Sequence, residues 1–166
     1  IINSGLSTSV VDLFVYSSNS VSPVISKRIS KNSSKRIYLD TLAPGEGSVA
    51  IHAITRSGRV TTYMHDERVR GLQPLGADFI SQGVEPAKRI VTPAISNVAL
   101  QSRKSEQILR ILVPGKVSAN VQAKLISSDG TFTPLGLDNI NADSGKVTDL
   151  KFKPVINSRN FALVLT

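Results

Sequence analysis

The chain has 166 residues, of which 40% are hydrophobic and 19% are charged, so it can form one ordinary domain or two small ones. It contains no cysteine, which excludes disulfides, thiol nucleophiles and cysteine-ligated metal sites and is compatible with a secreted protein. The net charge of +8 admits an anionic partner, although a solvated basic surface is the simpler interpretation. The densest basic groups are Lys27, Arg28, Lys31, Lys35 and Arg36, followed by Arg56, Arg59, Arg68 and Arg70.

The hydropathy and the first residues of the chain bear on where the protein is found in the cell. No apolar run approaches the roughly 18 to 20 residues that span a bilayer, and no signal peptide is recognisable. The chain opens on Ile1 and Ile2, which are typical of a strand, and its only methionine is Met64. We therefore expect a processed product or a piece of a longer protein, with any targeting segment upstream.

The first part of the chain predicts short strands separated by turns. Val11, Leu13 and Val15 alternate with other residues and would share one face of a strand. The expected strands are residues 10–16, 24–29, 36–39, 49–54 and 59–64.

Local signals refine these strands. Lys27 and Arg28 would protect an edge strand at 24–29 against aggregation. Ser57 and Gly58 predict a tight hairpin between the strands at 49–54 and 59–64. We interpret residues 60–79 as the last strand of one β-domain followed by the linker to the next, because glycines and a proline interrupt the stretch after Val69.

The second part of the chain repeats this pattern. Pro93 makes the strand at 89–95 an edge strand or a strand start. Further strands are expected at residues 108–113, 120–126, 132–137, 146–152 and 160–165. No window carries a convincing amphipathic helix, and turn signals every 8 to 12 residues are typical of a β-sandwich.

A weak internal repeat relates the two parts at a shift of 110 residues. Its apolar matches are Val11 with Val121, Leu13 with Ala123, and Val15 with Leu125. Turns and strand faces agree at nearly the same shift, which indicates two copies of one sandwich module. We place the modules at residues 1–80 and 81–166. Each lacks a strand that the other has, so both are expected to be truncated and to expose edges that can pair with another chain.

Three segments resemble a known family. They are residues 69–79 (VRGLQPLGADF), the turn at 43–45 (APG), and the hairpin at 128–134 (SDGTFTP) with Leu137 and Asp138. Together they resemble actinobacterial cell-envelope proteins of unknown function, which are built from immunoglobulin-like repeats. The resemblance implies two tandem immunoglobulin-like β-sandwiches in a secreted or membrane-anchored protein. It implies no catalytic residues, because that family has none assigned.

The run His65-Asp66-Glu67 is the first candidate for chemistry. A metal or acid–base site is one interpretation, but consecutive residues of a strand point to opposite faces and do not converge. His52 is the only other histidine. The predicted hairpin would bring His52 and His65 roughly into cross-strand register, so a two-histidine site stays open beside a solvated strand end.

Two other motifs fail on inspection. The run Ser144-Gly145-Lys146 lacks the glycine and hydroxyl that a phosphate loop requires, since Ile140 and Val147 occupy those positions. The cluster at residues 138–143 has too few carboxylates for a calcium loop and favours a turn whose side chains bond their own backbone.

Four cations flank the predicted linker: Arg68, Arg70, Lys88 and Arg89. They are the candidate binding residues for an anionic polymer between the modules. The aromatic side chains of a single-strand nucleic-acid platform are missing, so nucleic acid is not expected. A structural role is preferred for Arg70, namely an ion pair with Asp78 across the intervening turn.

The sequence thus predicts an all-β, non-catalytic, extracytoplasmic structural or interaction module, with no cofactor and no metal. Its partner is expected to be a protein or an anionic cell-wall polymer, and its parent protein to be anchored in a membrane or secreted. The alternative is a module that binds a carbohydrate or anionic wall polymer, for which the candidate stacking side chains are Phe14, Tyr16, Tyr38 and Tyr63. An enzyme would require a deep pocket that joins His52 and His65 to a carboxylate.

Overall fold

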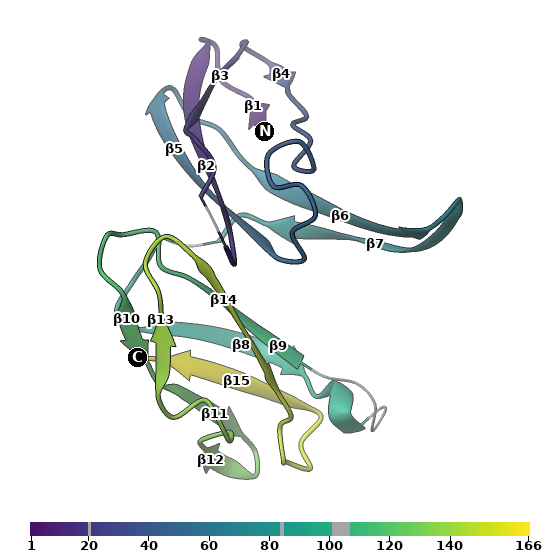
Figure 1. Cartoon of the computed structure of the whole chain (residues 1–166), viewed down its shortest axis with the longest axis vertical. Coiled ribbons are helices and arrows are strands. Elements are labelled where there is room, and N and C mark those ends of the chain that lie inside the picture. The colour runs from purple at the N-terminus through teal and green to yellow at the C-terminus, as the bar shows by residue number, and fades with distance from the viewer. Residues whose placement is uncertain (20, 84, 101–106) are drawn as a thin grey trace. The chain divides into compact units, whose positions relative to one another are not determined.

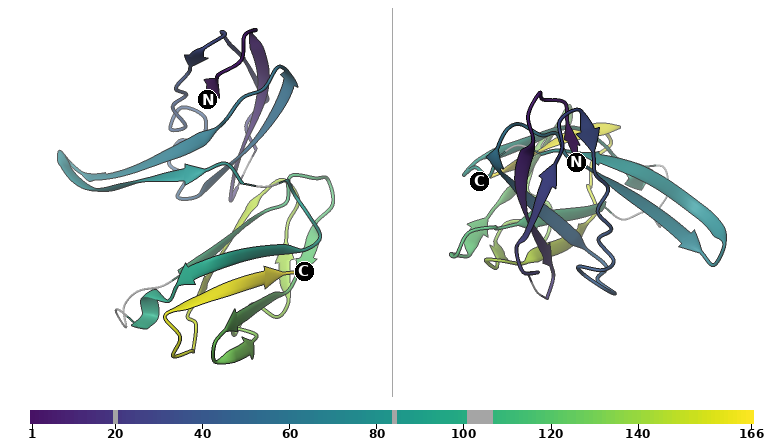
Figure 2. Two further views of the ribbon diagram at one scale, coloured as in Figure 1. Left: turned by 180° about the vertical axis from the view of Figure 1, so that it is seen from behind. Right: turned by 90° about the horizontal axis from the view of Figure 1, so that it is seen from above.

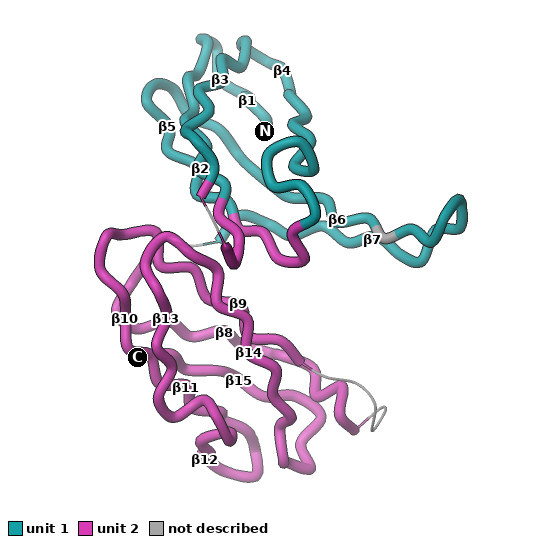
Figure 3. The backbone as a smooth tube through the Cα atoms, in the orientation of Figure 1, with its two compact units in different colours: residues 1–15, 22–45, 51–85 teal, residues 16–21, 46–50, 86–166 magenta. Residues whose placement is uncertain are grey.

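The computed structural model describes residues 1–19, 21–83, 85–100 and 107–166. The chain divides into two compact units, which Figure 3 shows in different colours. Unit 1 comprises residues 1–15, 22–45 and 51–85, and unit 2 comprises residues 16–21, 46–50 and 86–166. The division between the long segments falls after residue 85, five residues beyond the division predicted from the sequence.

Both units are built from β-strands, as predicted. The described regular elements are strands and one short 3-10 helix at Val98–Leu100. Within these residues no helix has the length and apolar character needed to cross a membrane.

The first seven strands lie wholly or mostly in unit 1 (Figure 1). They form a sheet of order β3-β2-β5 and two separate pairs, β1-β4 and β6-β7. Their bounds are β1 (Ile2–Asn3), β2 (Ser9–Ser17), β3 (Ile25–Ile29), β4 (Ser33–Ser34), β5 (Val49–Ser57), β6 (Tyr63–Arg70) and β7 (Gln73–Ser81).

The core of unit 1 lies on one face of the sheet. Val11 and Leu13 of β2 and Ile29 of β3 form its buried cluster. Val15 is also buried, so the inward face predicted for this strand is confirmed, and Asp12 and Tyr16 of its other face are buried as well. The predicted edge strand is confirmed as well, since β3 is an outer strand of the sheet. Strand β2 lies in the middle of the sheet, which explains why its sequence carries the clearest periodicity.

The predicted strand at 36–39 is wrong, because its backbone groups bond elsewhere. The N–H of Lys35 donates to the carbonyl of Ile1 at 2.8 Å, at the start of an irregular segment. The carbonyl of Leu39 accepts from the N–H groups of Leu42 and Ala43 at 2.8 and 2.9 Å. The chain therefore turns after Leu39 instead of joining a sheet ladder.

The predicted strand at 59–64, paired in a hairpin with 49–54, is also wrong. Strand β5 forms as expected, but its neighbour in the sheet is β2. Gly58 follows it with a φ of +77°, and Thr61 then exchanges backbone hydrogen bonds of 2.8 and 2.9 Å with Ile2. Strand β6 begins only at Tyr63. The chain leaves β5 to reach β1 and does not fold back on itself.

The predicted linker is instead half of a long β-ribbon. Strands β6 and β7 have 8 and 9 residues and pair along most of their length. The ribbon extends away from the rest of unit 1 (Figure 1, Figure 2). Gly71 supplies a φ of +61° at its tip, which a two-residue turn accommodates. Gly76 lies beside a register shift of the pairing, so the residues that suggested a linker are those that shape the ribbon.

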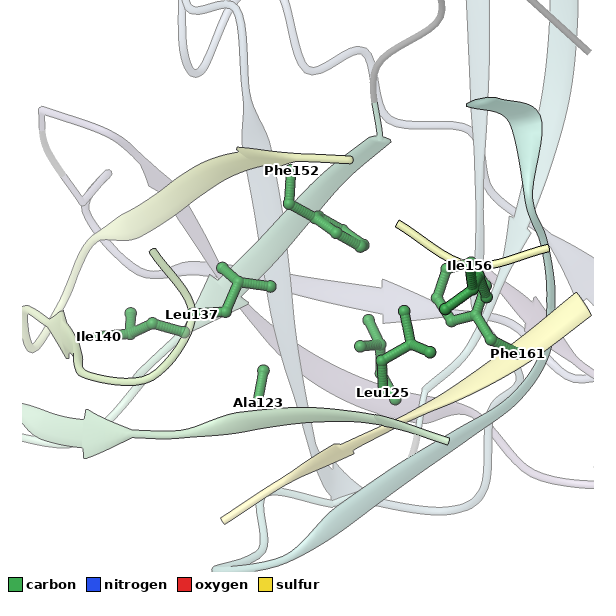
Figure 4. Packing of buried hydrophobic residues seen from close by; sticks show 8 residues of the cluster. Ala123, Leu125, Leu137, Ile140, Phe152, Ile156 and Phe161 are labelled. Carbon is green, nitrogen blue, oxygen red and sulfur yellow. The ribbon is translucent and has the colours of Figure 1, made fainter. Parts of the chain in front are cut away.

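Unit 2 contains a sheet of order β12-β11-β15-β8 and the pairs β14-β9 and β10-β13. Its buried cluster draws on both groups, with Leu125 and Phe161 from the larger sheet and Phe152 from β14 (Figure 4). The strand bounds are β8 (Ile90–Ser96), β9 (Gln107–Leu112), β10 (Ala119–Val121), β11 (Ala123–Ser127), β12 (Gly130–Phe132), β13 (Ile140–Ala142), β14 (Val147–Phe152) and β15 (Asn160–Leu165).

Most strands predicted for the second half are confirmed. Strand β8 contains Pro93 and lies at a sheet edge, where a missing N–H is tolerated. The strand predicted at 120–126 is divided at Gln122 into β10 and β11, which belong to different sheets. The strand predicted at 132–137 is wrong, because β12 ends at Phe132 and Gly136 takes a φ of +81°.

Candidate functional site

A shallow hollow with basic walls lies on unit 1. It has a volume of about 260 Å³ and is formed by β3 and by the irregular segment that follows β4. We call it the basic hollow, and its lining residues are Ile25, Lys27, Lys35, Arg36, Ile37, Tyr38, Thr41 and Leu42.

The basic hollow combines an apolar base with cationic walls. Ile25 and Ile37 are partly buried and pack against the core of unit 1. Lys35 and Arg36 are exposed, and the side chain of Tyr38 is 66% exposed. An aromatic ring beside several cations, above an aliphatic surface, can hold a ligand that has both an apolar face and a negative charge.

Lys27 enters the basic hollow from an unusual position. It lies opposite Val11 in the β2-β3 ladder, between the pairs of Leu13 with Ile25 and Ser9 with Ile29. Directly paired residues share a face of the sheet, so Lys27 lies on the core side of an edge strand. Lys27 is half-buried there and lines the hollow.

The segment that forms the basic hollow is held at both ends. The terminal ammonium of Ile1 donates to the carbonyl of Lys35 at 2.9 Å, and the Lys35 N–H donates back to Ile1. The hydroxyl of Thr41 donates to the carbonyl of Tyr38 at 3.1 Å. These bonds order the backbone around the hollow before any ligand arrives.

The β6-β7 ribbon presents a second candidate surface. Tyr63, His65 and Phe79 lie on one face of it, which we call the aromatic face. The rings of His65 and Phe79 stack with centroids 4.6 Å apart, and those of Tyr63 and Phe79 lie 5.8 Å apart. The side chain of Phe79 is 66% exposed, so the cluster is open to solvent.

The other face of the ribbon carries charged side chains together with Met64 and Ile80. Asp66 lies directly opposite Asp78, and Arg70 lies opposite Gln73 near the tip. Arg70 and Asp78 are therefore several residues apart along the ribbon and do not meet across the turn. The predicted ion pair between them is wrong, because the turn spans only Gly71 and Leu72.

The four cations predicted to bind an anionic polymer are divided between the units. Arg70 ends β6 in unit 1 and is exposed. Arg68 belongs to the same strand, and its side chain lies outside the described part of the structure. Lys88 and Arg89 are exposed and precede β8 in unit 2. A shared role for these four residues stays a prediction.

The two histidines occupy different sheets. His52 on β5 lies 6.0 Å from the ring of Phe14, and His65 on β6 stacks on Phe79. Strands β5 and β6 are not neighbours in any sheet of the described residues. Within that part of the chain, no group of three or more histidine or acidic side chains could hold a metal ion. The structure thus does not bring His52 and His65 together on one hairpin.

The basic hollow was not found from the sequence, although Tyr38 had been singled out as a stacking candidate. Lys27, Lys35 and Arg36 belong to the densest basic group of the chain, but the segment after Ser34 was read as a strand. A signal was present at Lys27, since alternation places it on the same face as Ile25 and Ile29.

The sequence model of a family of unknown function, DUF5719, matches residues 1–163. The chain belongs to this family. No curated protein and no solved structure gave a significant match. The family membership agrees with the expectation of a family without assigned function, and it leaves the role of the two candidate surfaces to be argued from their geometry.

Proposed function

We propose that this DUF5719 chain is a non-catalytic, extracytoplasmic interaction module whose β6-β7 ribbon docks on a partner protein. The observation that carries the proposal is the solvent-exposed aromatic face of the ribbon. Aromatic side chains that are rigid and exposed are the usual anchors of protein–protein interfaces.

Both strands of the ribbon also have an unpaired edge. The sheet formed by β6 and β7 contains only these two strands among the described residues. Every described side chain of β7 is exposed. A two-stranded ribbon is marginally stable by itself in water, so a partner that covers a face or pairs with an edge would stabilise it.

Aliphatic side chains favour a protein partner over a sugar at this surface. Val69 and Leu75 are 58% and 56% exposed, and Leu72 at the tip is fully exposed. Such side chains gain free energy by burial against apolar protein surface, at about 25 cal/mol per Å². A sugar ring offers only one small C–H face, whereas a protein surface can cover several of these side chains at once.

Three aspartates have structural roles. Hydrogen bonds lower the pKa of Asp12, Asp129 and Asp149. The main partners are Ser26 and then Arg56 for Asp12, Ser158 for Asp129, and Arg110 for Asp149. These bonds tie neighbouring segments together, which is a structural use of a carboxylate.

The proposal includes two immunoglobulin-like modules that derive from one ancestor. Its support is the neighbouring pair β2-β5 in unit 1 and the neighbouring pair β11-β15 in unit 2. In the predicted repeat, β2 corresponds to the segment of β10 and β11, and β5 corresponds to β15. Each unit has its own buried cluster, as separate modules require.

Site-specific photocrosslinking in cells that make the protein tests the docking surface. A photoreactive residue at position 79 points from the aromatic face, and one at position 80 points from the opposite face as the matched control. We expect position 79 to give a discrete protein adduct and position 80 to give little. Equal adducts from both positions, or adducts from neither, would overturn the proposal.

Location is tested separately on intact cells. The exposed lysines, which include Lys35 and Lys88, react with a membrane-impermeant biotin ester if they lie outside the cytoplasmic membrane. We expect labelling without cell lysis, with a known cytoplasmic protein as the control. Labelling only after lysis would exclude an extracytoplasmic location.

A further inference from the structure

We infer that the basic hollow of unit 1 binds an anionic sugar unit of a polysaccharide. The inference concerns a ligand site and is independent of the partner protein proposed for the β6-β7 ribbon. Its ligand class is a pyranose ring that bears a carboxylate or another acidic group, as in a uronic acid.

The charges around the basic hollow favour an anion. Three cationic side chains line it, from Lys27, Lys35 and Arg36, and no carboxylate does so among its described lining residues. None of the ion pairs between described residues involves these three cations. Their charge is therefore available to a ligand.

The nearest acidic residue of the sheet is already neutralised. Asp12 on β2 accepts a hydrogen bond from the Arg56 guanidinium at 2.6 Å and another from the hydroxyl of Ser26. Asp12 is paired with Ser26 across the ladder, whereas Lys27 belongs to the next pair and the opposite face. The carboxylate of Asp12 is thus paired with Arg56, and it does not neutralise Lys27 on the other face of the sheet.

Lys27 departs from the rule that core-side positions of a strand are apolar. An inward-pointing charge can protect an edge strand from pairing with another chain. A single charged residue on the strand is enough for this protection. Protection of the edge does not require Lys35 and Arg36, which follow β4, to line the same hollow as Lys27. A ligand site would explain why three cationic residues line one hollow.

The remaining lining residues select a sugar rather than a bare anion. A pyranose ring has a face of C–H groups, which packs on aromatic or aliphatic surface. Tyr38 offers an exposed ring, and Ile25, Ile37 and Leu42 offer aliphatic surface beside it. Inorganic phosphate would gain nothing from the three aliphatic side chains.

The size of the basic hollow fits one sugar residue. Its volume of about 260 Å³ is slightly below the range of about 300–1,000 Å³ that is typical of pockets for drug-sized ligands. The hollow is shallow and open, so the neighbouring units of a polysaccharide can continue across the surface. The hollow can therefore bind a sugar unit in the middle of a polysaccharide as well as one at its end.

Affinity electrophoresis of the purified chain through gels that contain a polymer tests the inference. Polygalacturonate presents acidic pyranose rings, dextran presents neutral ones, and poly-glutamate presents carboxylates without sugar. We expect strong retardation by polygalacturonate, weak retardation by poly-glutamate and none by dextran. The retardation by polygalacturonate should fall as salt is added, because charge contributes to it.

Two double variants separate the basic hollow from net charge. Lys35→Gln/Arg36→Gln removes two cations of the hollow, and Lys116→Gln/Arg159→Gln removes two exposed cations of unit 2 as the matched control. We expect the first to weaken binding of polygalacturonate about tenfold or more, since each charge-assisted hydrogen bond has a large effect. The control should change binding by less than about twofold, as expected for surface charges that do not line the hollow.

Tyr38 provides the test for the sugar ring. Tyr38→Phe keeps the ring and should bind polygalacturonate as the parent does, whereas Tyr38→Ser should bind it about threefold to tenfold less tightly. Neither change should alter the weak binding of poly-glutamate. Equal losses in the two double variants, or equal retardation by polygalacturonate and poly-glutamate, would overturn the inference. Failure of this test leaves the ribbon proposal intact, because the two proposals concern different surfaces. Phe79→Ser, on the ribbon, should accordingly leave binding of the polymer unchanged.

Discussion

Asp12 on the central strand β2 accepts a hydrogen bond of 2.6 Å from the guanidinium of Arg56 on β5, while Ser26 on β3 donates to the same carboxylate. One buried carboxylate thus joins all three strands of the β3-β2-β5 sheet. The hydroxyl of Ser26 and the guanidinium of Arg56 lower the pKa of Asp12 below its ordinary value of 3.8.

This arrangement predicts a pH-dependent effect of Asp12→Asn on stability. Because the folded-state pKa is lowered, the charged form contributes stability above about pH 4, and the contribution is lost as pH falls through the folded-state pKa. We expect Asp12→Asn to lower the melting temperature at pH 7 and the difference from the parent to shrink below pH 4. The exposed Asp40→Asn is the control and should have little effect at any pH. A difference that grows in acid would contradict the assignment.

Gly58 is predicted to tolerate no side chain. It has a φ of +77°, and a Cβ atom there would lie 2.2 Å from the hydroxyl oxygen of Ser9 and 3.2 Å from its Cα. Gly45 has a similar φ of +73° with open space around it. We expect Gly58→Ala to destabilise by about 2–5 kcal/mol and Gly45→Ala by about 1–2 kcal/mol, measured by urea unfolding. Equal effects would show that the contact with Ser9 is relieved at little cost.

Truncation of Leu125 is predicted to destabilise unit 2 strongly. Leu125 is 1% exposed in the middle of the buried cluster, beside Phe152 and Leu163. Leu125→Ala removes buried apolar contacts and leaves a cavity, so we expect a loss of about 2–5 kcal/mol in the free energy of unfolding. Leu135→Ala, at a side chain 99% exposed, should change it by less than about 0.5 kcal/mol. A small effect at Leu125 would mean that the cluster collapses around the missing side chain.

The β6-β7 ribbon is predicted to open more readily than the sheets. Its amides exchange with solvent through local opening, and few buried contacts oppose that opening. Native-state hydrogen exchange should show lower protection for β6 and β7 than for β11 and β15. In the presence of the partner protein the protection of the ribbon should rise. Protection equal to that of β11 in the isolated chain would show that the ribbon is stable without a partner.

The alternation of Val11, Leu13 and Val15 was readable because one face of β2 is buried in a core. Burial on one side imposes a period of two on the sequence, and the period predicts both the strand and its inward face. Strands β5, β14 and β15 were predicted from apolar residues bounded by turn signals. Residues 36–39 carried a similar pattern, but it was not decisive, since the ladder partner of a strand is not encoded in its own periodicity.

The ribbon escaped prediction for the opposite physical reason. Its strands bury neither face, so no period of two appears, and Gly71, Pro74 and Gly76 resemble a linker. In the fold Gly71 makes the turn and Gly76 accompanies the register shift. The predicted ion pair of Arg70 with Asp78 was wrong for the same reason. The turn is only two residues long, so Arg70 lies opposite Gln73 and Asp78 lies opposite Asp66.

The candidate sites show the same division. Arg68, Arg70, Lys88 and Arg89 were grouped because they are near one another in sequence, yet they lie in different units. Lys27, Lys35 and Arg36 surround one hollow although a turn and the short strand β4 separate them. A common role for the first four residues stays a prediction. For Lys27, Lys35 and Arg36, closeness in sequence shows only a basic stretch, and the hollow that they line depends on where the backbone of residues 35–42 is anchored.

The sequence by itself determined the all-β class, most strands of both halves and the inward face of β2, because these follow from local periodicity and turn chemistry. Only the tertiary structure decided that residues 63–81 form an exposed ribbon and that three cations and Tyr38 surround one hollow. Those features depend on hydrogen bonds between distant segments, such as Ile1 with Lys35 and Ile2 with Thr61. No local pattern specifies such long-range pairing, since each backbone group can bond equally well to many partners.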